Sequence, residues 1–424
     1  MHFSNTSISL FILSMLDTFA GAKCSPGADC HEPSTYDGFD GGSGKDPGSG
    51  YSSNYGGAFG ALKQPYYPPA ADCEDYMIPI DIEYDNLVFN ATKWEDNYGL
   101  IDFLTEATAR AGAGYPSPVE QKHTKGSFEI AASFCSPKKK TSKAKNVIIA
   151  THGIGPARAH WNSPFKPEDY NFVQWAIGQG YSVFFYDRLG CGASQKVTGY
   201  EASIFTAIAI LKELAGVVKA GKYTGSIGKP HKTAVMGFSF GSYTTHGAVA
   251  TMPDIADAVV LTAIGFNETG LNANGLVRSF EPRIANVQNS ALYGDLDNGY
   301  LTWVDKFGLI WNYFKKPNYE PSAADFVESS KAPFGIVEFL SFLGGPTDAQ
   351  NYTGPVLAIT GELDYIVCDG SCDGIFEEPA KTYYKNAKFT PYLQPGTSHH
   401  LNFATNATGA FKVITDFLAS SGLN

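Results

Sequence analysis

The sequence predicts an α/β fold in which a mostly parallel sheet is flanked by helices. The first observation is that, from residue 147 onward, short apolar runs of strand length alternate with segments of helical pattern. Such alternation is typical of a parallel sheet that is covered on both faces. The second observation is a Gly-x-Ser-x-Gly sequence at 237–241, which lies between an apolar run and a helical segment.

Six apolar runs are the expected strands of the parallel region, at 147–150, 181–186, 233–236, 259–262, 355–360 and 389–393. Helices are expected at 169–179, at 200–220, from residue 240 onward and at 404–419. Before this region, two segments alternate apolar and polar residues and predict further strands, at 78–89 and 127–134. A helical pattern at 97–112 separates them.

Residues 265–350 break the alternation and predict a helical cap, inserted between two strands of the sheet. Several short helices are expected there, and they would lie over the carboxyl edge of the sheet, where ligands bind in open α/β folds. The expected core is therefore divided into 73–264 and 351–424. The cap contains an aromatic stretch that suggests either an apolar pocket or packing within the cap, formed by Trp303, Phe307, Trp311, Tyr313 and Phe314.

The N-terminus reads as a secretory signal peptide at 1–22. A short apolar run at 8–16 precedes Ala20-Gly21-Ala22, which fits a cleavage site before Lys23. A buried N-terminal helix is the alternative. Residues 23–72 are expected to be flexible, because nine glycines fall within 37–60 and no apolar periodicity is present. No later stretch predicts a membrane span, so a secreted, extracellular protein is expected.

The cysteines and glycosylation sequons agree with an oxidising compartment. Seven cysteines allow three disulfides and one free thiol. The candidate pairs are Cys73–Cys135, Cys368–Cys372 and, by default, Cys24–Cys30, which leaves Cys191 free, with a catalytic thiol as its alternative role. No metal site is expected, since paired Cys-x-x-Cys groups are absent. Asn-x-Thr sequons predict N-glycosylation at Asn90, Asn267, Asn351 and Asn406.

The composition limits the class of partner. The formal net charge of -11 argues against nucleic acid and anionic membranes as partners. The aromatic content of 14% suits an apolar small-molecule ligand and also suits a large core. No cofactor is implied, and the oligomeric state is left open.

The pentapeptide Gly237-Phe238-Ser239-Phe240-Gly241 predicts a nucleophile elbow between a strand and a helix. In such a turn the serine has a strained backbone, and glycines two residues to either side avoid a steric clash. Ser239 is therefore the candidate nucleophile, at the positive end of a helix. The backbone N–H of Phe240 is a candidate donor to an oxyanion.

The partners of this serine are expected at the ends of later strands. Asp364 follows the strand at 355–360, and the neighbours His399 and His400 follow the last strand. The order Ser, Asp, His is that of a hydrolytic triad on an α/β sheet. The second oxyanion donor is expected after the strand at 147–150, from Ile154 or alternatively Gly155.

Other polar residues have simpler interpretations. Asp187 and Arg188 are interpreted as a structural pair that holds loops, and Glu362 as a turn residue. His152 is interpreted as a loop brace and His246 as a packing residue.

These motifs together resemble the α/β-hydrolase superfamily. They are His152-Gly153, the run from Tyr186 to Ser194 (Tyr-Asp-Arg-Leu-Gly-Cys-Gly-Ala-Ser), the elbow, Asp364 and His399. The chain looks closest to the secreted AB hydrolase-1 type serine hydrolases of fungi over about 73–420, through His-Gly-Ile-Gly at 152–155 and Asp-Arg-Leu-Gly at 187–190. The family's pattern of a small residue, His, any residue, Leu and Asn places the base at His399 and leaves His400 as a rim residue.

The resemblance implies a serine hydrolase, and we expect it to cleave a carboxylic ester. The same triad serves other reactions, so a peptidase or a cofactor-free perhydrolase is an alternative. A secreted binding protein with an inactive site is the alternative from a different class.

Overall fold

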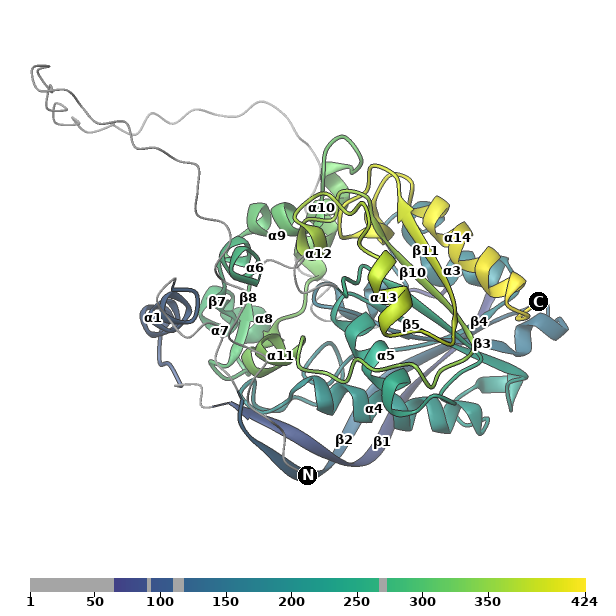
Figure 1. Cartoon of the computed structure of the whole chain (residues 1–424), viewed down its shortest axis with the longest axis horizontal. Coiled ribbons are helices and arrows are strands. Elements are labelled where there is room, and N and C mark those ends of the chain that lie inside the picture. Colours follow the sequence, from purple (N-terminus) through teal and green to yellow (C-terminus); the bar gives the residue numbers. More distant parts are fainter. Residues whose placement is uncertain (1–64, 90–92, 110–117, 267–272) are drawn as a thin grey trace, which may run out of the picture. The chain divides into compact units, whose positions relative to one another are not determined.

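The computed structural model describes residues 65–89, 93–109, 118–266 and 273–424 (Figure 1). The signal peptide, Cys24, Cys30, Asn90 and Asn267 lie outside these residues. Eight strands form the main sheet: β1 (Ala71–Phe89), β2 (Pro118–Pro137), β3 (Asn146–Thr151), β4 (Ser182–Tyr186), β5 (Lys232–Phe238), β6 (Ala258–Thr262), β10 (Pro355–Gly361) and β11 (Lys388–Gln394).

The sheet is mostly parallel, as the sequence predicts. Its strand order is β1-β2-β4-β3-β5-β6-β10-β11. Only the pairs β1–β2 and β2–β4 are antiparallel, and the other neighbours run parallel. The helices around it are α2 (Pro167–Tyr170), α3 (Phe172–Gly178), α4 (Ile204–Lys219), α5 (Phe240–Thr251), α12 (Tyr365–Cys368), α13 (Glu377–Thr382) and α14 (Ala407–Ser420). Helix α1 (Asn97–Ala107) contacts the inserted segment at 283–284 instead.

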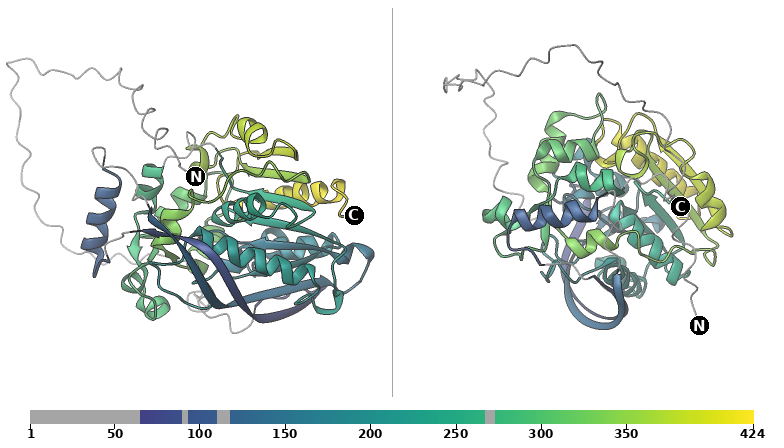
Figure 2. Two further views of the ribbon diagram at one scale, coloured as in Figure 1. Left: turned by 60° about the horizontal axis from the view of Figure 1, so that its bottom comes forward. Right: turned by 60° about the vertical axis from the view of Figure 1, so that its left-hand side comes forward.

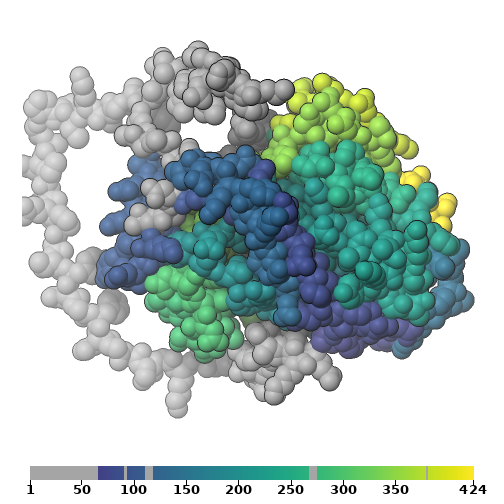
Figure 3. All heavy atoms as spheres, turned by 90° about the horizontal axis from the view of Figure 1, so that it is seen from below, coloured from purple at the N-terminus to yellow at the C-terminus, as the bar shows by residue number. Residues whose placement is uncertain are grey.

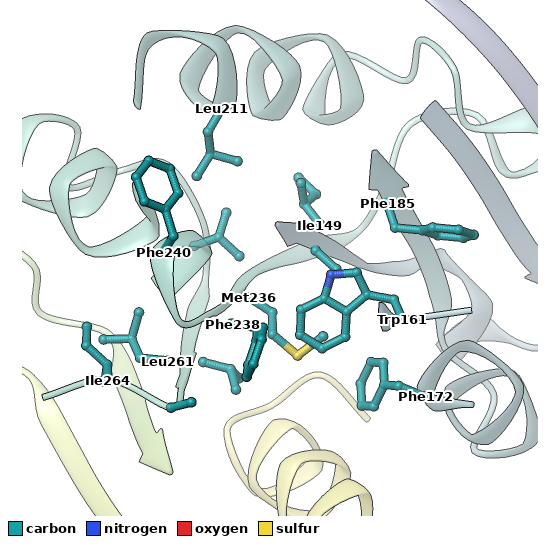
Figure 4. Close-up of a cluster of buried hydrophobic side chains, with 14 of the residues drawn as sticks. Ile149, Trp161, Phe172, Phe185, Leu211, Met236, Phe238, Phe240, Leu261 and Ile264 are labelled. Carbon is teal, nitrogen blue, oxygen red and sulfur yellow. The ribbon is translucent and has the colours of Figure 1, made fainter. Parts of the chain in front are cut away.

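Helices cover both faces of the sheet. Helices α4 and α5 pack together on one face, and α3 and α14 pack together on the other (Figures 1 and 2). Strand β3 is buried along its whole length. Figure 4 shows part of this core, where Met236 of β5 lies beside the indole of Trp161. Full burial of such a side chain contributes about 1.5–3 kcal/mol, so these strands anchor the loops at their ends.

Strands β1 and β2 form a long curved ribbon along one edge of the sheet. Strand β2 pairs with β4 only at 132–135, whereas it pairs with β1 over nearly its whole length. Figure 2 shows the ribbon, and Figure 3 shows it lying beside α4. A disulfide joins Cys73 to Cys135, which face each other in the register.

Some element boundaries differ from the sequence prediction. The helix expected at 97–112 ends at Ala107, and the C-cap Thr108 has non-helical backbone angles, φ -107° and ψ 6°. The helix expected at 169–179 is divided at Asn171, which has an extended backbone and caps α3 by accepting from the N–H of Gln174 at 2.7 Å. The Asn171 side chain therefore competes locally with a continued helix.

The folded part also begins earlier than residue 73. Tyr66, which the sequence analysis assigned to the flexible segment, donates from its hydroxyl to Gln174 Oε1 at 2.6 Å. Its carbonyl accepts from Asn162 at 2.6 Å. Four short 3-10 helices complete the core: η1 (Ser142–Lys145), η2 (Ala157–His160), η3 (Gly225–Ile227) and η4 (Leu401–Phe403).

The inserted segment contains a small sheet as well as helices. Its helices are α6 (Ala273–Phe280), α7 (Ala285–Gln288), α8 (Ser290–Tyr293), α9 (Lys306–Tyr313), α10 (Pro321–Ser330) and α11 (Ile336–Ser341). Its antiparallel strands, in the order β7-β8-β9, are β7 (Arg283–Ile284), β8 (Tyr300–Thr302) and β9 (Phe334–Gly335). This small sheet was not predicted from the sequence, since strands of two or three residues show no alternation. Across the described ranges, no helix is both long and apolar enough to span a bilayer.

Candidate active site

Ser239 occupies the sharp turn between β5 and α5. Its backbone angles are φ 51° and ψ -120°, a region that residues with a side chain seldom adopt. A Cβ atom on Gly237 would lie 2.3 Å from the carbonyl oxygen of Gly241, and one on Gly241 would lie 2.2 Å from that of Thr151. Glycine is therefore required at both positions by close backbone approach.

The last residue of β6 holds this turn. The Ser239 N–H donates to the carbonyl of Thr262 at 2.9 Å, and the Ser242 hydroxyl donates to the same oxygen at 2.7 Å. The Thr262 hydroxyl in turn donates to the carbonyl of Gly237 at 2.8 Å. The unusual conformation of Ser239 is thus fixed by the neighbouring strand.

Three side chains far apart in the sequence form one hydrogen-bonded series. Ser239 Oγ lies 2.8 Å from His399 Nε2. His399 Nδ1 lies 2.8 Å from Asp364 Oδ2 and 3.0 Å from Oδ1. The imidazole and the carboxylate are both 0% exposed. Because an ionised carboxylate only accepts, the proton of neutral His399 belongs on Nδ1, and Nε2 is free to accept from the hydroxyl of Ser239.

Asp364 is held by donors other than the histidine. It caps α12, accepting from the N–H groups of Ile366 at 2.9 Å and Val367 at 3.2 Å. The Thr360 hydroxyl donates to its other oxygen at 2.6 Å. A buried carboxylate needs such partners to stay ionised. They also fix the direction in which it faces the imidazole.

A disulfide closes the chain just after the acid. It joins Cys368, the last residue of α12, to Cys372. Within this loop the Gly370 N–H donates to the carbonyl of Asp364 at 2.9 Å. Glu362 accepts from the N–H of Gly396 at 2.7 Å, so it joins the acid turn to the histidine loop.

The loop after β3 lies against the serine turn. A Cβ atom on Gly153 would lie 2.6 Å from the carbonyl oxygen of Phe238 and 2.9 Å from Cβ of Ser239. Within the described ranges, the N–H groups of Ile154 and Phe240 have no hydrogen-bond acceptor. Unpaired N–H groups beside a nucleophile are suited to bind a developing oxyanion.

His152 holds the start of this loop. Its Nε2 accepts from the N–H of Arg188 at 3.0 Å, so Nδ1 carries the proton and bonds to the carbonyl of Gly153 at 2.7 Å. Burial and the nearby Arg188 charge hold the pKa of His152 well below its usual value. The neutral imidazole of His152 therefore joins the loop after β3 to the backbone of Arg188, and it has a structural role.

Asp187 and Arg188 are not paired with each other, which corrects the sequence interpretation. Asp187 accepts from Arg158 Nε at 3.2 Å. Arg188 instead forms a buried ion pair with Glu338 of α11, and its guanidinium lies 4.5 Å from the ring centre of Phe240. Arg188 and Glu338 are 150 residues apart, so no sequence spacing could have indicated that this pair joins core and cap.

His400 is not a rim residue, which is a second correction. Its ring is buried and stacks on Tyr313 and Phe403, with 4.9 Å between ring centres in each case. Its Nε2 lies 3.3 Å from Nδ1 of His160, a buried histidine that the sequence analysis did not single out. Burial, followed by the neighbouring His160 and His399, lowers the pKa of His400 well below its usual value.

The aromatic stretch of the cap does not form one pocket. Trp303 and Tyr313 are buried, whereas Phe307 is 70% exposed and Trp311 is 58% exposed. A separate cavity of about 60 Å³ is lined by residues including Tyr243, His246, Phe266 and Phe342, and Ser239 does not line it. His246 bonds there to the Tyr384 hydroxyl at 2.7 Å. Where the chain is described, no cluster of three His, Cys, Asp or Glu side chains could hold a metal ion.

Comparisons with known proteins identify the class to which this fold and site belong. Residues 147–410 match the alpha/beta hydrolase family. The chain therefore belongs to the alpha/beta hydrolase family. The secreted fungal subtype suggested by the sequence remains an expectation. No match was found among the curated proteins that were compared.

Several solved structures are similar to this chain at low identity. A thermophilic esterase from Thermogutta terrifontis, with malate bound, is 18% identical, with 70% of this chain and 95% of that chain covered and a TM-score of 0.48. The monoacylglycerol lipase of Paleococcus ferrophilus is 16% identical, with 69% and 99% covered and a TM-score of 0.46. A hydrolase from Pseudomonas aeruginosa PA01 is 15% identical, with 69% and 94% covered and a TM-score of 0.46.

Proposed function

We propose that this chain is a serine hydrolase that cleaves a carboxylic ester through an acyl-enzyme. One observation carries the proposal: Ser239, His399 and Asp364 form a hydrogen-bonded series with 2.8 Å at each step. A hydroxyl, a base and an acid that orients the base are the three groups that acyl transfer requires.

In the proposed reaction, Ser239 Oγ attacks the ester carbonyl carbon while its proton passes to His399 Nε2. The carbonyl oxygen becomes an oxyanion, which the N–H groups of Phe240 and Ile154 stabilise. The intermediate collapses, and the leaving alcohol takes the proton from His399. Water then attacks the acyl-enzyme by the same route and releases the carboxylic acid. Throughout, Asp364 stabilises the imidazolium and keeps its Nδ1 proton directed inward.

The proposal is tested with p-nitrophenyl esters of increasing acyl length and with a fluorophosphonate probe. The wild-type protein should hydrolyse at least one ester and should be labelled at Ser239. Ser239→Ala should lose both properties, whereas Ser420→Ala, on the outer helix α14, should keep both. A folded wild-type protein that neither turns over any ester nor reacts with the probe would favour a binding protein with an inactive site.

We also propose that the enzyme acts outside the cell. The features in favour are the signal-like N-terminus and the disulfides Cys73–Cys135 and Cys368–Cys372, since such bonds persist in oxidising compartments. The proposed substrate is a small, apolar ester, and no nucleic acid is expected as a partner.

A further inference from the structure

One cap residue contacts both loops that carry the candidate catalytic groups. Tyr313, at the end of α9, is 1% exposed. Its hydroxyl donates to the carbonyl of Ile154 in the loop after β3. Its own carbonyl accepts from the N–H of His400 at 3.1 Å. The two hydrogen bonds of this one residue therefore connect the loop of Ile154 to the loop of His399.

The ring of Tyr313 also packs against the histidines. It is almost parallel to His400, at 3° and with 4.9 Å between centres. It lies 5.5 Å from the centre of His399, at 23°. Phe403 stacks on His400 at 9° and so completes the layered arrangement. A rigid aromatic stack restrains the plane of each member, including the imidazole that contacts Ser239.

The hydrogen bond to Ile154 acts on the part of the loop that faces the oxyanion. The carbonyl of Gly153 is already held by His152, and that of Gly155 accepts from the N–H groups of Ala157 at 2.9 Å and Ala332 at 2.7 Å. In the described chain, the remaining carbonyl, that of Ile154, is held by Tyr313. Because a peptide unit is planar, fixing this carbonyl also fixes the direction of the Gly155 N–H.

The two N–H groups considered as the second oxyanion donor therefore flank the carbonyl that Tyr313 holds. Gly155 has φ 138°, a conformation open to glycine, so this loop has few intrinsic restraints of its own. Burial raises the pKa of the Tyr313 phenol, so the hydroxyl remains a donor at neutral and mildly alkaline pH.

We propose that Tyr313 is a positioning residue, which holds the oxyanion loop at a fixed distance from the catalytic histidine. This inference rests on the proposed ester hydrolysis and adds to it a requirement for the cap. The oxyanion site is completed by a contact from α9, and the hydrogen bond from Ala332 to Gly155 supports the same loop from the segment before β9.

The test is Tyr313→Phe, which removes the hydroxyl and retains the stacked ring. We expect kcat to fall about 10- to 100-fold, somewhat less than the loss of a direct oxyanion donor, with KM changed less than about threefold. Affinity for a boronic acid that mimics the tetrahedral intermediate should fall by a similar factor. Rates are expressed per active site titrated with fluorophosphonate, so that unfolded protein does not imitate the effect.

The matched control is Tyr300→Phe. Tyr300 is also a buried tyrosine of the cap, and its hydroxyl donates to the carbonyl of Val197 at 2.8 Å, away from the triad. The variant Tyr300→Phe should lower the melting temperature about as much as Tyr313→Phe does, while leaving kcat and boronate affinity unchanged. Equal kcat values for wild type and Tyr313→Phe, or equal losses in the two tyrosine variants, would overturn the proposal.

A second variant covers failure of Tyr313→Phe to fold. Ala332→Pro removes the N–H that donates to Gly155, and Lys331 has the extended backbone, φ -61° and ψ 140°, that a residue before proline adopts. Full kcat and boronate affinity in Ala332→Pro would also overturn the proposal. If wild-type protein neither hydrolyses esters nor is labelled at Ser239, the proposed function itself has failed, which is a different outcome from an active wild type with an unaffected Tyr313→Phe.

Discussion

At the scale of single residues, two adjacent histidines have opposite surroundings. His399 contacts Ser239 through one ring nitrogen and Asp364 through the other. His400 has aromatic rings on both faces, and its nearest polar partner is His160. A base must reach both the nucleophile and the orienting acid, so the surroundings favour His399 for that role.

We predict that the triad acts as one unit. Ser239→Ala and His399→Ala should each lower kcat by about 10⁴–10⁶, and the double variant should be little worse, because neither group catalyses alone. Asp364→Asn should cost somewhat less, since the imidazole remains but has the wrong tautomer. Steady-state ester hydrolysis measures all four. Additive losses in the double variant would show that the two residues do not act together.

We predict that His400 matters mainly for packing. His400→Ala leaves a gap between Tyr313 and Phe403 and should lower the free energy of unfolding by about 3 kcal/mol, as for other buried aromatic truncations. His400→Phe should restore most of that stability. Both should keep at least 100-fold more activity than His399→Ala. Urea unfolding and ester assays of the three variants check this, and an inactive His400→Phe beside an active His399→Ala would move the base to His400.

At the scale of elements, the short helix α12 orients the carboxylate of Asp364. The N–H groups of its second and third residues donate to Asp364, and its last residue, Cys368, is bonded to Cys372. The other disulfide joins two long paired strands at the opposite edge of the sheet. The two bonds therefore have different expected effects on activity.

We predict that removing the Cys368–Cys372 bond lowers kcat as well as stability. In Cys368→Ser/Cys372→Ser, stability should fall by less than about 2–4 kcal/mol, because the closed loop is small. The kcat per titrated site should fall, because Asp364 is less firmly oriented. The control Cys73→Ser/Cys135→Ser should lose stability and keep kcat per site. Identical kcat values in both double variants would mean that the small loop does not orient the acid.

At the scale of the whole molecule, the described fold buries several histidines that are neutral. Burial lowers the pKa of each below its usual value, to about 4 for His246, and the others are His152, His160 and His400. In the unfolded chain these groups titrate near pH 6.5. Below that pH the unfolded chain takes up protons that the folded protein does not, so the folded state loses stability.

We therefore predict that the contribution of these buried histidines to the free energy of unfolding is fully present above about pH 6.5. This contribution should decrease as the pH falls below that value. His246 alone should account for roughly 3 kcal/mol between pH 6.5 and 4. Urea unfolding at several pH values between 7.5 and 4.5 gives the slope of the free energy of unfolding against pH. The variant His246→Gln should reduce this slope by the equivalent of up to one proton. His123 serves as the control, because its acidic neighbours Asp85 and Glu83 raise its pKa. Its contribution to the free energy of unfolding therefore decreases as the pH rises, which is opposite in sign to that of His246. A slope unchanged in His246→Gln would contradict the prediction.

We also predict that the chain is secreted and glycosylated. A eukaryotic host should release a protein that begins near Lys23. Glycans are expected at Asn351 and Asn406, which are exposed in the described fold, and the sequons at Asn90 and Asn267 are further candidates. N-terminal sequencing and treatment with a peptide N-glycosidase check both points. Intracellular protein that retains residues 1–22 and carries no glycan would be the contrary result.

The features that could be predicted from the sequence are those that depend on local patterns. Buried parallel strands such as β3 are short apolar runs, so their number and their positions along the chain could be predicted from the sequence pattern. The elbow at Ser239 could be predicted because its glycines are demanded by contacts within the turn itself and with the adjacent strand β3. Asp364 and His399 followed from their places at strand ends and from the family pattern.

Contacts between side chains that are distant in the sequence could not be predicted and are known from the folded structure. It pairs Arg188 with Glu338 rather than with Asp187, buries His400 against Tyr313, and brings Tyr313 to Ile154. These contacts join core and cap segments whose separation in the sequence carries no periodic signal. They are selected by the packing of the cap on the core, because a buried ion or hydroxyl must find a partner wherever the fold places one.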